Sequence, residues 1–265
     1  MKENRQQEIL TALEHYHFLT ARQCVEMFHR SEATIRRDFV LLHQSGLVKK
    51  VHGGIQAVTE DRASPLAPVP LRLNWNQGQK RLLAETAVKH IKPDETLMVH
   101  GGTTIMQLAA CLGNRNRIIT NSPQFCQTIT ARFHADAPEV ILSGGRFDFR
   151  SGLILGAQCC SFIRQYQCDV AIASPFGCDP DGITDIDDEY AELLLTVLMS
   201  CRKRILLADS SKFRRHGIRR VVPWEKIDML ITSFDPEYQD ELERIRNLGV
   251  KVLLIPEQDQ QSQSE

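Results

Sequence analysis

The sequence predicts an α/β protein of two parts: a small N-terminal winged helix-turn-helix joined to a larger Rossmann-like α/β domain with a mostly parallel sheet. The first 58 residues contain three short helical patterns followed by a hairpin pattern. The remainder alternates helical patterns with short apolar runs, as parallel sheets covered by helices do. We expect domains over residues 1–58 and 75–265, joined by a linker over residues 59–74.

The composition, 42% hydrophobic and 25% charged in 265 residues, is typical of a globular protein. No stretch reaches the roughly 18 apolar residues of a membrane helix, and the N-terminus lacks the apolar core of a signal peptide. We therefore expect a cytoplasmic protein with no membrane partner. The eight cysteines form no C-x-x-C pair or zinc spacing, so we expect no metal site. Most of them are expected to be small apolar packing residues, with a redox role as the alternative for Cys159 and Cys160. We expect no cofactor.

The first two helices follow from apolar spacing and from a capping pattern. Residues 5–14 place apolar side chains on one helical stripe and predict a first helix. Thr20, followed three positions later by Gln23, has the pattern of a capping box and predicts a second helix over residues 21–28.

A third helix begins after Ser31, which is a favourable N-cap residue. Ile35, Phe39 and Leu42 fall at i, i+4 and i+7 and are expected to face the core. The positions left toward solvent or DNA are Glu32, Ala33, Thr34, Arg36 and Arg37.

A hairpin follows the third helix, which Gly46 is expected to end. Two strand patterns, residues 47–51 and 55–58, flank a His52-Gly53-Gly54 turn, which predicts a wing. Net charge over the whole chain is only −1, but residues 30–52 hold five Lys and Arg against two Asp and Glu. Positive charge is therefore concentrated in one segment, as a DNA-binding face requires.

Three short helices and a wing predict binding to a double-stranded DNA operator, with the third helix in the major groove. Arg36 or Arg37 is suited to guanine edges, and the wing to phosphates. Arg36 and Arg37 alone would usually be a solvated pair, but the caps and the basic wing favour DNA. The predicted DNA-binding residues are Ser31, Glu32, Ala33, Thr34, Arg36, Arg37, Lys49, Lys50 and His52.

The larger domain follows a segment with Pro65, Pro68 and Pro70 and no periodicity, which predicts a semi-extended spacer. Short apolar runs then predict parallel strands, whose carboxyl ends bind ligands in sheets of this type. These runs are residues 96–99, 117–120, 139–142, 170–173, 205–208, 229–232 and 250–255.

Polar and small residues follow several of these runs. The first run leads into His100-Gly101-Gly102-Thr103-Thr104 and a helix predicted over residues 105–112, an arrangement suited to a phosphate. Similar loops hold Thr120-Asn121-Ser122, Ser143-Gly144-Gly145-Arg146 and residues 179–184, and a further loop holds Lys212. Glycines, hydroxyls, amides and one lysine together suit a small polyhydroxylated anion.

Residues 31–39 and 46–54 closely resemble the DNA-binding signature of the DeoR family, Ser-x-x-Thr-Ile-Arg-Arg-Asp-Leu followed by a His-Gly-Gly wing. The strand-end loops resemble that family's sensor domain, which is related to ribose-5-phosphate isomerase, so the resemblance covers nearly the whole chain. Arg30 stands where the family usually has a small apolar residue, and His100 where it has aspartate. Residues 174–177, Ser-Pro-Phe-Gly, replace a more usual Ile-Gly-Ala stretch.

The resemblance implies a phosphorylated sugar as effector. By it, Gly102, Thr103 and Thr104 cradle the phosphate, Lys212 adds charge, and other loop residues reach sugar hydroxyls. We expect His100 to remove an acceptor and to add positive charge at lower pH, so that the effector differs from the common one. The predicted effector-binding residues are His100, Gly102, Thr103, Thr104, Asn121, Ser122, Gly144, Gly145, Asp179, Gly182, Glu192 and Lys212.

The function expected from the resemblance is repression of a carbohydrate-utilisation operon by a homodimer or homotetramer that a phosphorylated sugar releases. The alternative is a sugar-phosphate isomerase fused to a DNA anchor, which needs a positioned carboxylate base. No Lys-Gly-Gly counterpart of the related isomerases lies between Gly182 and Ser200, and the acidic run over residues 185–190 is interpreted as a solvated helix start. We therefore do not expect an enzyme.

Overall fold

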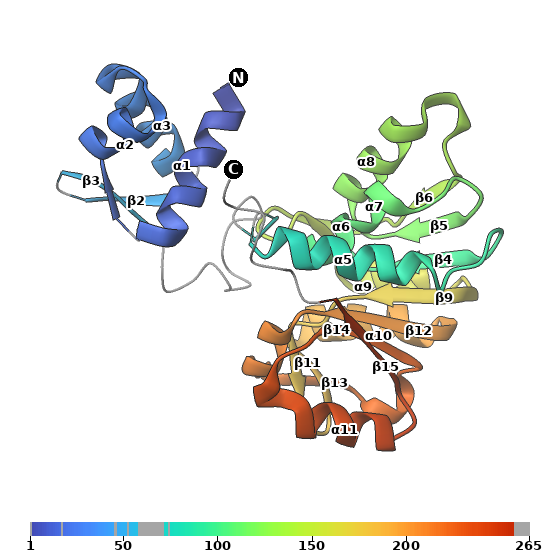
Figure 1. Cartoon of the computed structure of the whole chain (residues 1–265). Coiled ribbons are helices and arrows are strands. Elements are labelled where there is room, and N and C mark those ends of the chain that lie inside the picture. The colour runs from blue at the N-terminus through green and yellow to red at the C-terminus, as the bar shows by residue number, and fades with distance from the viewer. Residues whose placement is uncertain are drawn as a thin grey trace. The chain divides into compact units, whose positions relative to one another are not determined.

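The computed structural model describes residues 2–16, 18–44, 47–51, 53–57, 72, 73 and 75–256. The chain forms two compact units, Met1–Trp75 and Asn76–Glu265 (Figure 1). The predicted linker over residues 59–74 lies largely outside the described residues, so its boundaries stay a prediction. Within the described part, no helix has the length and apolar character needed to cross a bilayer.

The N-terminal unit is a winged helix-turn-helix, as predicted. Its three strands form an antiparallel sheet in the order β1-β3-β2. The sequence did not predict β1, which adds a third strand to the wing. The elements are α1 (Lys2–Tyr16), β1 (Phe18–Thr20), α2 (Ala21–Phe28), α3 (Glu32–Gln44), β2 (Val48–Val51) and β3 (Gly54–Ala57).

Local hydrogen bonds fix the two turns of this unit. Thr20 forms the predicted capping box: its Oγ1 accepts from the Gln23 backbone N–H at 3.1 Å, and its own N–H donates to Gln23 Oε1 at 2.9 Å. Ser31 Oγ accepts from the Thr34 backbone N–H at 3.3 Å. The expected helix stop at Gly46 lies outside the described residues.

The two wing glycines serve different purposes. Gly53 has φ of 86°, a left-handed conformation that favours glycine. Gly54 lies against β1, where a Cβ would approach the Leu19 carbonyl oxygen to 2.2 Å. The first glycine therefore permits the turn, and the second permits the close pairing of β1 and β3.

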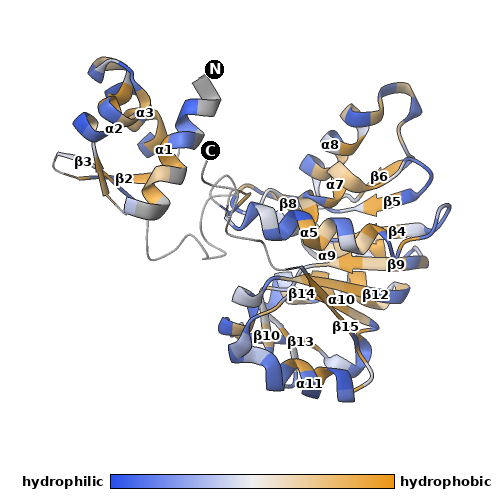
Figure 2. Ribbon diagram, in the orientation of Figure 1, coloured by the Kyte–Doolittle hydropathy of each residue, from blue (hydrophilic) through white to orange (hydrophobic). Residues whose placement is uncertain are grey.

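The second unit is built on a seven-stranded parallel sheet in the order β15-β14-β12-β9-β4-β5-β6. Each of the seven predicted apolar runs is a strand of this sheet, and Figure 2 shows these strands as mostly apolar. The strands are β4 (Thr96–Val99), β5 (Arg117–Thr120), β6 (Val140–Leu142), β9 (Cys168–Ala173), β12 (Cys201–Ala208), β14 (Met229–Ser233) and β15 (Lys251–Ile255).

Helices cover both faces of this sheet, and alternate strand residues enter two separate cores. One core packs against α5 (Gln77–Val88), α6 (Thr103–Met106), α7 (Leu108–Cys111) and α8 (Pro123–Phe133). The other packs against α9 (Ala157–Ile163), α10 (Asp188–Met199) and α11 (Gln239–Asn247). The prediction of one helix over residues 105–112 was wrong, because α6 and α7 are two short helices that meet at Gln107.

Two smaller sheets were not predicted. β7 (Arg146–Asp148) and β8 (Leu153–Leu155) form a hairpin, and β10 (Gly177–Asp179), β11 (Gly182–Asp185) and β13 (Arg219–Pro223) form an antiparallel sheet. Short 3-10 turns complete the unit: η1 (His134–Asp136), η2 (Ser210–Arg214), η3 (Trp224–Lys226) and η4 (Pro236–Tyr238).

The course of β13 orients the small sheet. This strand starts after the loop that follows β12 and ends at η3, just before β14 begins. Asp185 pairs with Arg219, whereas Gly182 pairs with Pro223. Asp185 therefore lies toward the carboxyl ends of the central strands, and Gly182 lies toward their amino ends.

Candidate DNA interface and effector site

The outward face of α3 carries the two predicted arginines. Arg36 and Arg37 are both exposed. Arg36 donates to Glu32 Oε1 at 2.8 and 2.6 Å, one turn away on the same helix. Arg37 forms no hydrogen bond or ion pair with another described residue. Exposed i,i+4 pairs are weak, so both guanidinium groups are available to a phosphate or a base edge.

The wing adds two further cations. Lys49 and Lys50 are exposed on β2, which is an edge strand of the small sheet. Of the other predicted contact residues, Ser31 and Ala33 are exposed near the start of α3, and Thr34 is half-buried. His52 lies outside the described residues. All of the described residues in this set except Thr34 are therefore exposed, as binding to a duplex requires.

One charged residue of α3 points inward, although it was not predicted to do so. Asp38 is 1% exposed and lies on the same stripe as Ile35, Phe39 and Leu42. Arg5 of α1 donates to both carboxylate oxygens of Asp38, at 2.5 Å through Nε and 3.0 Å through Nη2. A charge on an otherwise apolar stripe is a sequence feature that predicts such a partner.

The candidate effector site lies at the carboxyl edge of the central sheet. β4 has β5 on one side and β9 on the other, so the chain order reverses there, which is where open α/β sheets bind ligands. α6, which begins at Thr103, packs against β12, the strand that leads to Lys212. Because neighbouring strands lie about 4.8 Å apart, the ends of β4 and β12 are separated by about 10 Å. A small phosphorylated molecule can span that distance.

Glycines at this edge differ in what surrounds them. A Cβ on Gly102 or Gly144 would meet no atom within 4 Å, so open space faces both backbones. On Gly145 a Cβ would approach the Leu155 carbonyl oxygen to 2.7 Å. Gly102 and Gly144 therefore permit close approach of a ligand, whereas Gly145 is required for packing against β8.

Asn121 and Ser122 lie at the same edge, but their side chains form hydrogen bonds within the protein. Asn121 Oδ1 accepts from the Gly101 N–H at 2.7 Å, and its amide donates to the Ile154 carbonyl at 3.2 Å. Ser122 Oγ accepts from the Phe125 N–H at 3.2 Å and caps α8. Both residues are buried and hold the loops in place.

His100 follows β4 and is 4% exposed. Neither ring nitrogen has a hydrogen-bond partner. Burial lowers the pKa of His100 to about 4. Positive charge on this imidazole is therefore confined to about pH 4 and below, because desolvation disfavours the charged form.

Lys212 and Asp185 are close enough for their charges to interact, but they form no ion pair. Burial lowers the pKa of Lys212 to about 8, opposed in part by Asp209 and Asp185. Burial also raises the pKa of Asp185 to about 6. Asp185 is 6% exposed, so its interpretation as part of a solvated helix start was wrong, whereas Asp187 does cap α10 by accepting from the Tyr190 N–H at 3.0 Å.

Lys80 is a further cation at this edge that was not predicted from the sequence. It lies on α5, is 4% exposed, and donates to Thr103 Oγ1 at 3.3 Å. Leu83, Ala84 and Ala87 follow it on the same buried stripe. A lysine at the start of an apolar helical stripe was the available sequence indication. Thr104, the last residue of the predicted cradle, is also buried.

Three predicted effector residues are not brought to this edge. Asp179 and Gly182 flank the turn of the β10–β11 hairpin, toward the amino ends of the central strands. The Asp179 carbonyl accepts from Trp224 Nε1 at 2.9 Å, and its carboxylate Oδ1 lies 2.6 Å from His216 Nδ1. Glu192 pairs with Arg164 and lines a surface groove of about 490 Å³ beside α9 and α10.

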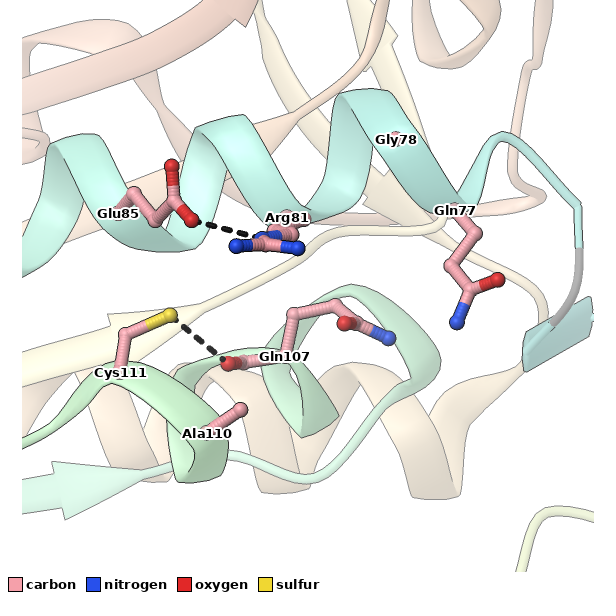
Figure 3. A pocket seen from close by; sticks show the side chains of 7 residues that line it. All are labelled: Gln77, Gly78, Arg81, Glu85, Gln107, Ala110 and Cys111. Atoms are coloured by element: carbon pink, nitrogen blue, oxygen red, sulfur yellow. Dashed lines mark hydrogen bonds and ion pairs between the residues drawn. The ribbon is translucent and has the colours of Figure 1, made fainter.

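A second groove, of about 620 Å³, lies between α5 and α7 (Figure 3). Arg81 and Glu85 lie one turn apart on α5 and form an ion pair at 2.7 Å on that wall of the groove. On the opposite wall, Cys111 donates to the Gln107 carbonyl at 3.4 Å. Its lining includes none of the residues predicted to bind an effector. The described residues contain no group of three or more His, Cys, Asp or Glu side chains placed to hold a metal ion.

Comparison with known protein families bears on both units. The family model of the DeoR C-terminal sensor domain matches residues 75–233, which is more than half of the chain. The chain belongs to the DeoR family. The DeoR-like helix-turn-helix domain of this family matches residues 5–61, which include α3 and the wing. The resemblance inferred from the sequence is thereby confirmed.

Relatives within the DeoR family are similar over nearly their whole length. A putative aga operon transcriptional repressor of Escherichia coli O157:H7 is 24% identical, over 96% of this chain and 94% of the relative. The glycerol-3-phosphate regulon repressor of Haemophilus influenzae is 28% identical, over 88% of this chain and 90% of the relative. These relatives are named as repressors, not as enzymes.

Among solved structures, ribose 5-phosphate isomerase A from Neisseria gonorrhoeae is 20% identical over 51% of this chain and 52% of that chain, with a TM-score of 0.35. A similarity this distant carries no argument about activity. The two relatives described above are named as repressors, which does not support the isomerase alternative.

Proposed function

We propose that this DeoR-family protein is a transcriptional repressor of a carbohydrate-utilisation operon, and that a phosphorylated sugar releases it from its operator. The observation that carries the proposal is the exposed basic face of α3, where Arg36 and Arg37 lie between a capped helix start and a basic wing. The names of its relatives, which include operon and regulon repressors, support the same role. We place its action in the cytoplasm, where a bacterial operator lies.

On DNA, α3 would enter the major groove with Arg37 and Arg36 toward base edges or phosphates. Lys49 and Lys50 of the wing would bind the backbone. We infer a homodimer or homotetramer, because two heads at half-sites about one helical turn apart give the affinity that one small module lacks.

The effector would bind across the carboxyl ends of β4 and β12. Its phosphate would lie at the open backbone of Gly102 and at the side chains of Thr103 and Lys212, with Lys80 behind Thr103. Asp185, whose carboxyl lies toward the same edge, is suited to accept from a sugar hydroxyl. Release follows if the effector binds better to the conformation in which the heads no longer match the operator spacing.

The proposal is tested by selection of DNA with the full-length protein. Duplexes retained from a random-sequence pool are sequenced after several rounds, and affinity is measured by fluorescence anisotropy. We expect one enriched motif with two related half-sites about 10 base pairs apart, or a multiple of that spacing. A pool that stays random, with equal affinity for every duplex, would show that the protein is not an operator-binding repressor.

A further inference from the structure

A buried ion pair joins α1 and α3, and the role assigned to it below rests on the proposed function of α3 in reading DNA. Asp38 is the charged member of a stripe whose other buried residues, Ile35, Phe39 and Leu42, are apolar. Arg5 binds both of its oxygens as a fork, and Gln6 Nε2 donates to Oδ1 at 3.4 Å. Arg37, exposed on the outer face, is the neighbour of Asp38 in sequence.

Stability alone does not account for this arrangement. The Asp38 side chain is 2% exposed and that of Arg5 18%, so both groups give up much of their hydration. Replacing such a buried pair with apolar residues of similar volume is often neutral or stabilising. Apolar contacts do not fix the orientation of a helix, because they permit it to slide and roll by small amounts. Two hydrogen bonds from one guanidinium group prevent these movements.

Small movements of α3 matter for recognition. The side-chain surface of a helix lies about 5–6 Å from its axis, so a roll of about 10° moves the outer side chains by about 1 Å. Hydrogen bonds to base edges tolerate only about 0.5 Å in length. Contacts to phosphates through long flexible side chains tolerate more.

We propose that the Arg5–Asp38 pair is a positioning element that sets the roll of α3 and thereby the sequence specificity of DNA binding, without touching DNA. The pair acts through Arg36 and Arg37, which α3 carries on its exposed side. Its loss reduces discrimination between operator and random DNA, and leaves the general affinity for duplexes in place.

The test is the specificity ratio, defined as the affinity of the full-length protein for the duplex it selects divided by its affinity for a random-sequence duplex. R5M alone leaves a buried carboxylate unpaired, so the decisive variant is R5M/D38L, which removes both charges. We expect a cooperative thermal transition, a ratio at least tenfold below wild type, and unchanged random-duplex affinity with an unchanged salt dependence. R5K keeps the positive charge but not the two-point hydrogen bonding. Its specificity ratio is expected to lie between those of wild type and R5M/D38L.

The matched control is R81Q/E85Q, which removes an exposed ion pair on α5 and should leave the ratio unaltered. A ratio within twofold of wild type in folded R5M/D38L overturns the proposal. If R5M/D38L does not melt cooperatively, R5K takes its place as the test. Its specificity ratio is expected to be three- to tenfold below wild type, and a ratio within twofold of wild type overturns the proposal. Failure of wild type itself to prefer any duplex would overturn the proposed function instead, so the two failures are distinguishable.

Discussion

Protonation of His100 gives a prediction about acid stability that follows directly from its burial. The folded-state pKa of about 4 lies below the unfolded value of about 6.5. As pH falls through 6.5, His100 becomes protonated in the unfolded chain but stays neutral in the folded chain. Stability is therefore lost between pH 6.5 and 4, and the loss is complete only below the folded pKa.

The size of the effect follows from the two pKa values. One pKa unit corresponds to about 1.4 kcal/mol, so His100 costs about 2 kcal/mol of folding free energy at pH 5 relative to pH 8. His100→Gln removes the titrating group. The difference in stability between wild type and this variant should therefore change by about 2 kcal/mol over that range, whereas contributions from other groups cancel in the difference.

The assay is urea unfolding followed by tryptophan fluorescence at pH 8, 6.5 and 5. Trp224 is fully buried in the sensor unit and reports on that unit, and a Trp75→Phe background removes the other tryptophan. His134→Gln, at an exposed histidine of the same unit, is the matched control and should show no such change. A wild-type minus His100→Gln difference that stays constant from pH 8 to pH 5 would refute the reasoning.

The remaining predictions concern four positions. Arg37→Ala should weaken operator binding and lower the slope of log affinity against log salt by about 1; unaltered affinity and slope in a gel-shift series would place Arg37 away from DNA. Effector affinity should fall as pH rises through 8, where Lys212 loses its proton, and Lys212→Arg should abolish that fall; a titration calorimetry profile equal in both proteins would contradict this. Asp185→Asn should stabilise the folded protein at pH 7 by about 2–3 kcal/mol, because the folded pKa of Asp185, about 6, lies above its unfolded value. The gain should disappear toward pH 4, and chemical denaturation that shows no gain at pH 7 would exclude a buried carboxylate. Gly54→Ala should impair DNA binding while effector binding persists, because its Cβ meets the Leu19 carbonyl at 2.2 Å; wild-type anisotropy curves for this variant would show that the wing tolerates the change.

The strands of the central sheet were predictable because burial on both faces requires continuous apolar runs. β7 shows why other strands were missed. It is three residues long, reads Arg-Phe-Asp, and has no buried stripe. Its pairing with β8 comes from tertiary contacts, since Asp148 accepts from Tyr190 Oη at 2.8 Å.

The site was predictable only in part, because sequence does not reveal the direction of a short hairpin. Residues 179–184 were expected to contribute Asp179 and Gly182, but the hairpin brings its other end, Asp185, to the carboxyl edge. Charges on buried stripes were the other gap. Asp38 and Lys80 were not singled out from the sequence, because their partners are 33 and 23 positions away in the chain.

The proposed control of DNA binding in one unit by a pocket in the other can be tested directly. Its most direct test is a titration of phosphorylated sugars into the complex of the full-length protein with its selected duplex, followed by anisotropy, with each sugar also added in unphosphorylated form. We predict that one phosphorylated sugar releases the wild-type protein, that its unphosphorylated form does not, and that Lys212→Ala binds the duplex normally but is not released. Equal release of Lys212→Ala and wild type by the same phosphorylated sugar would contradict the account.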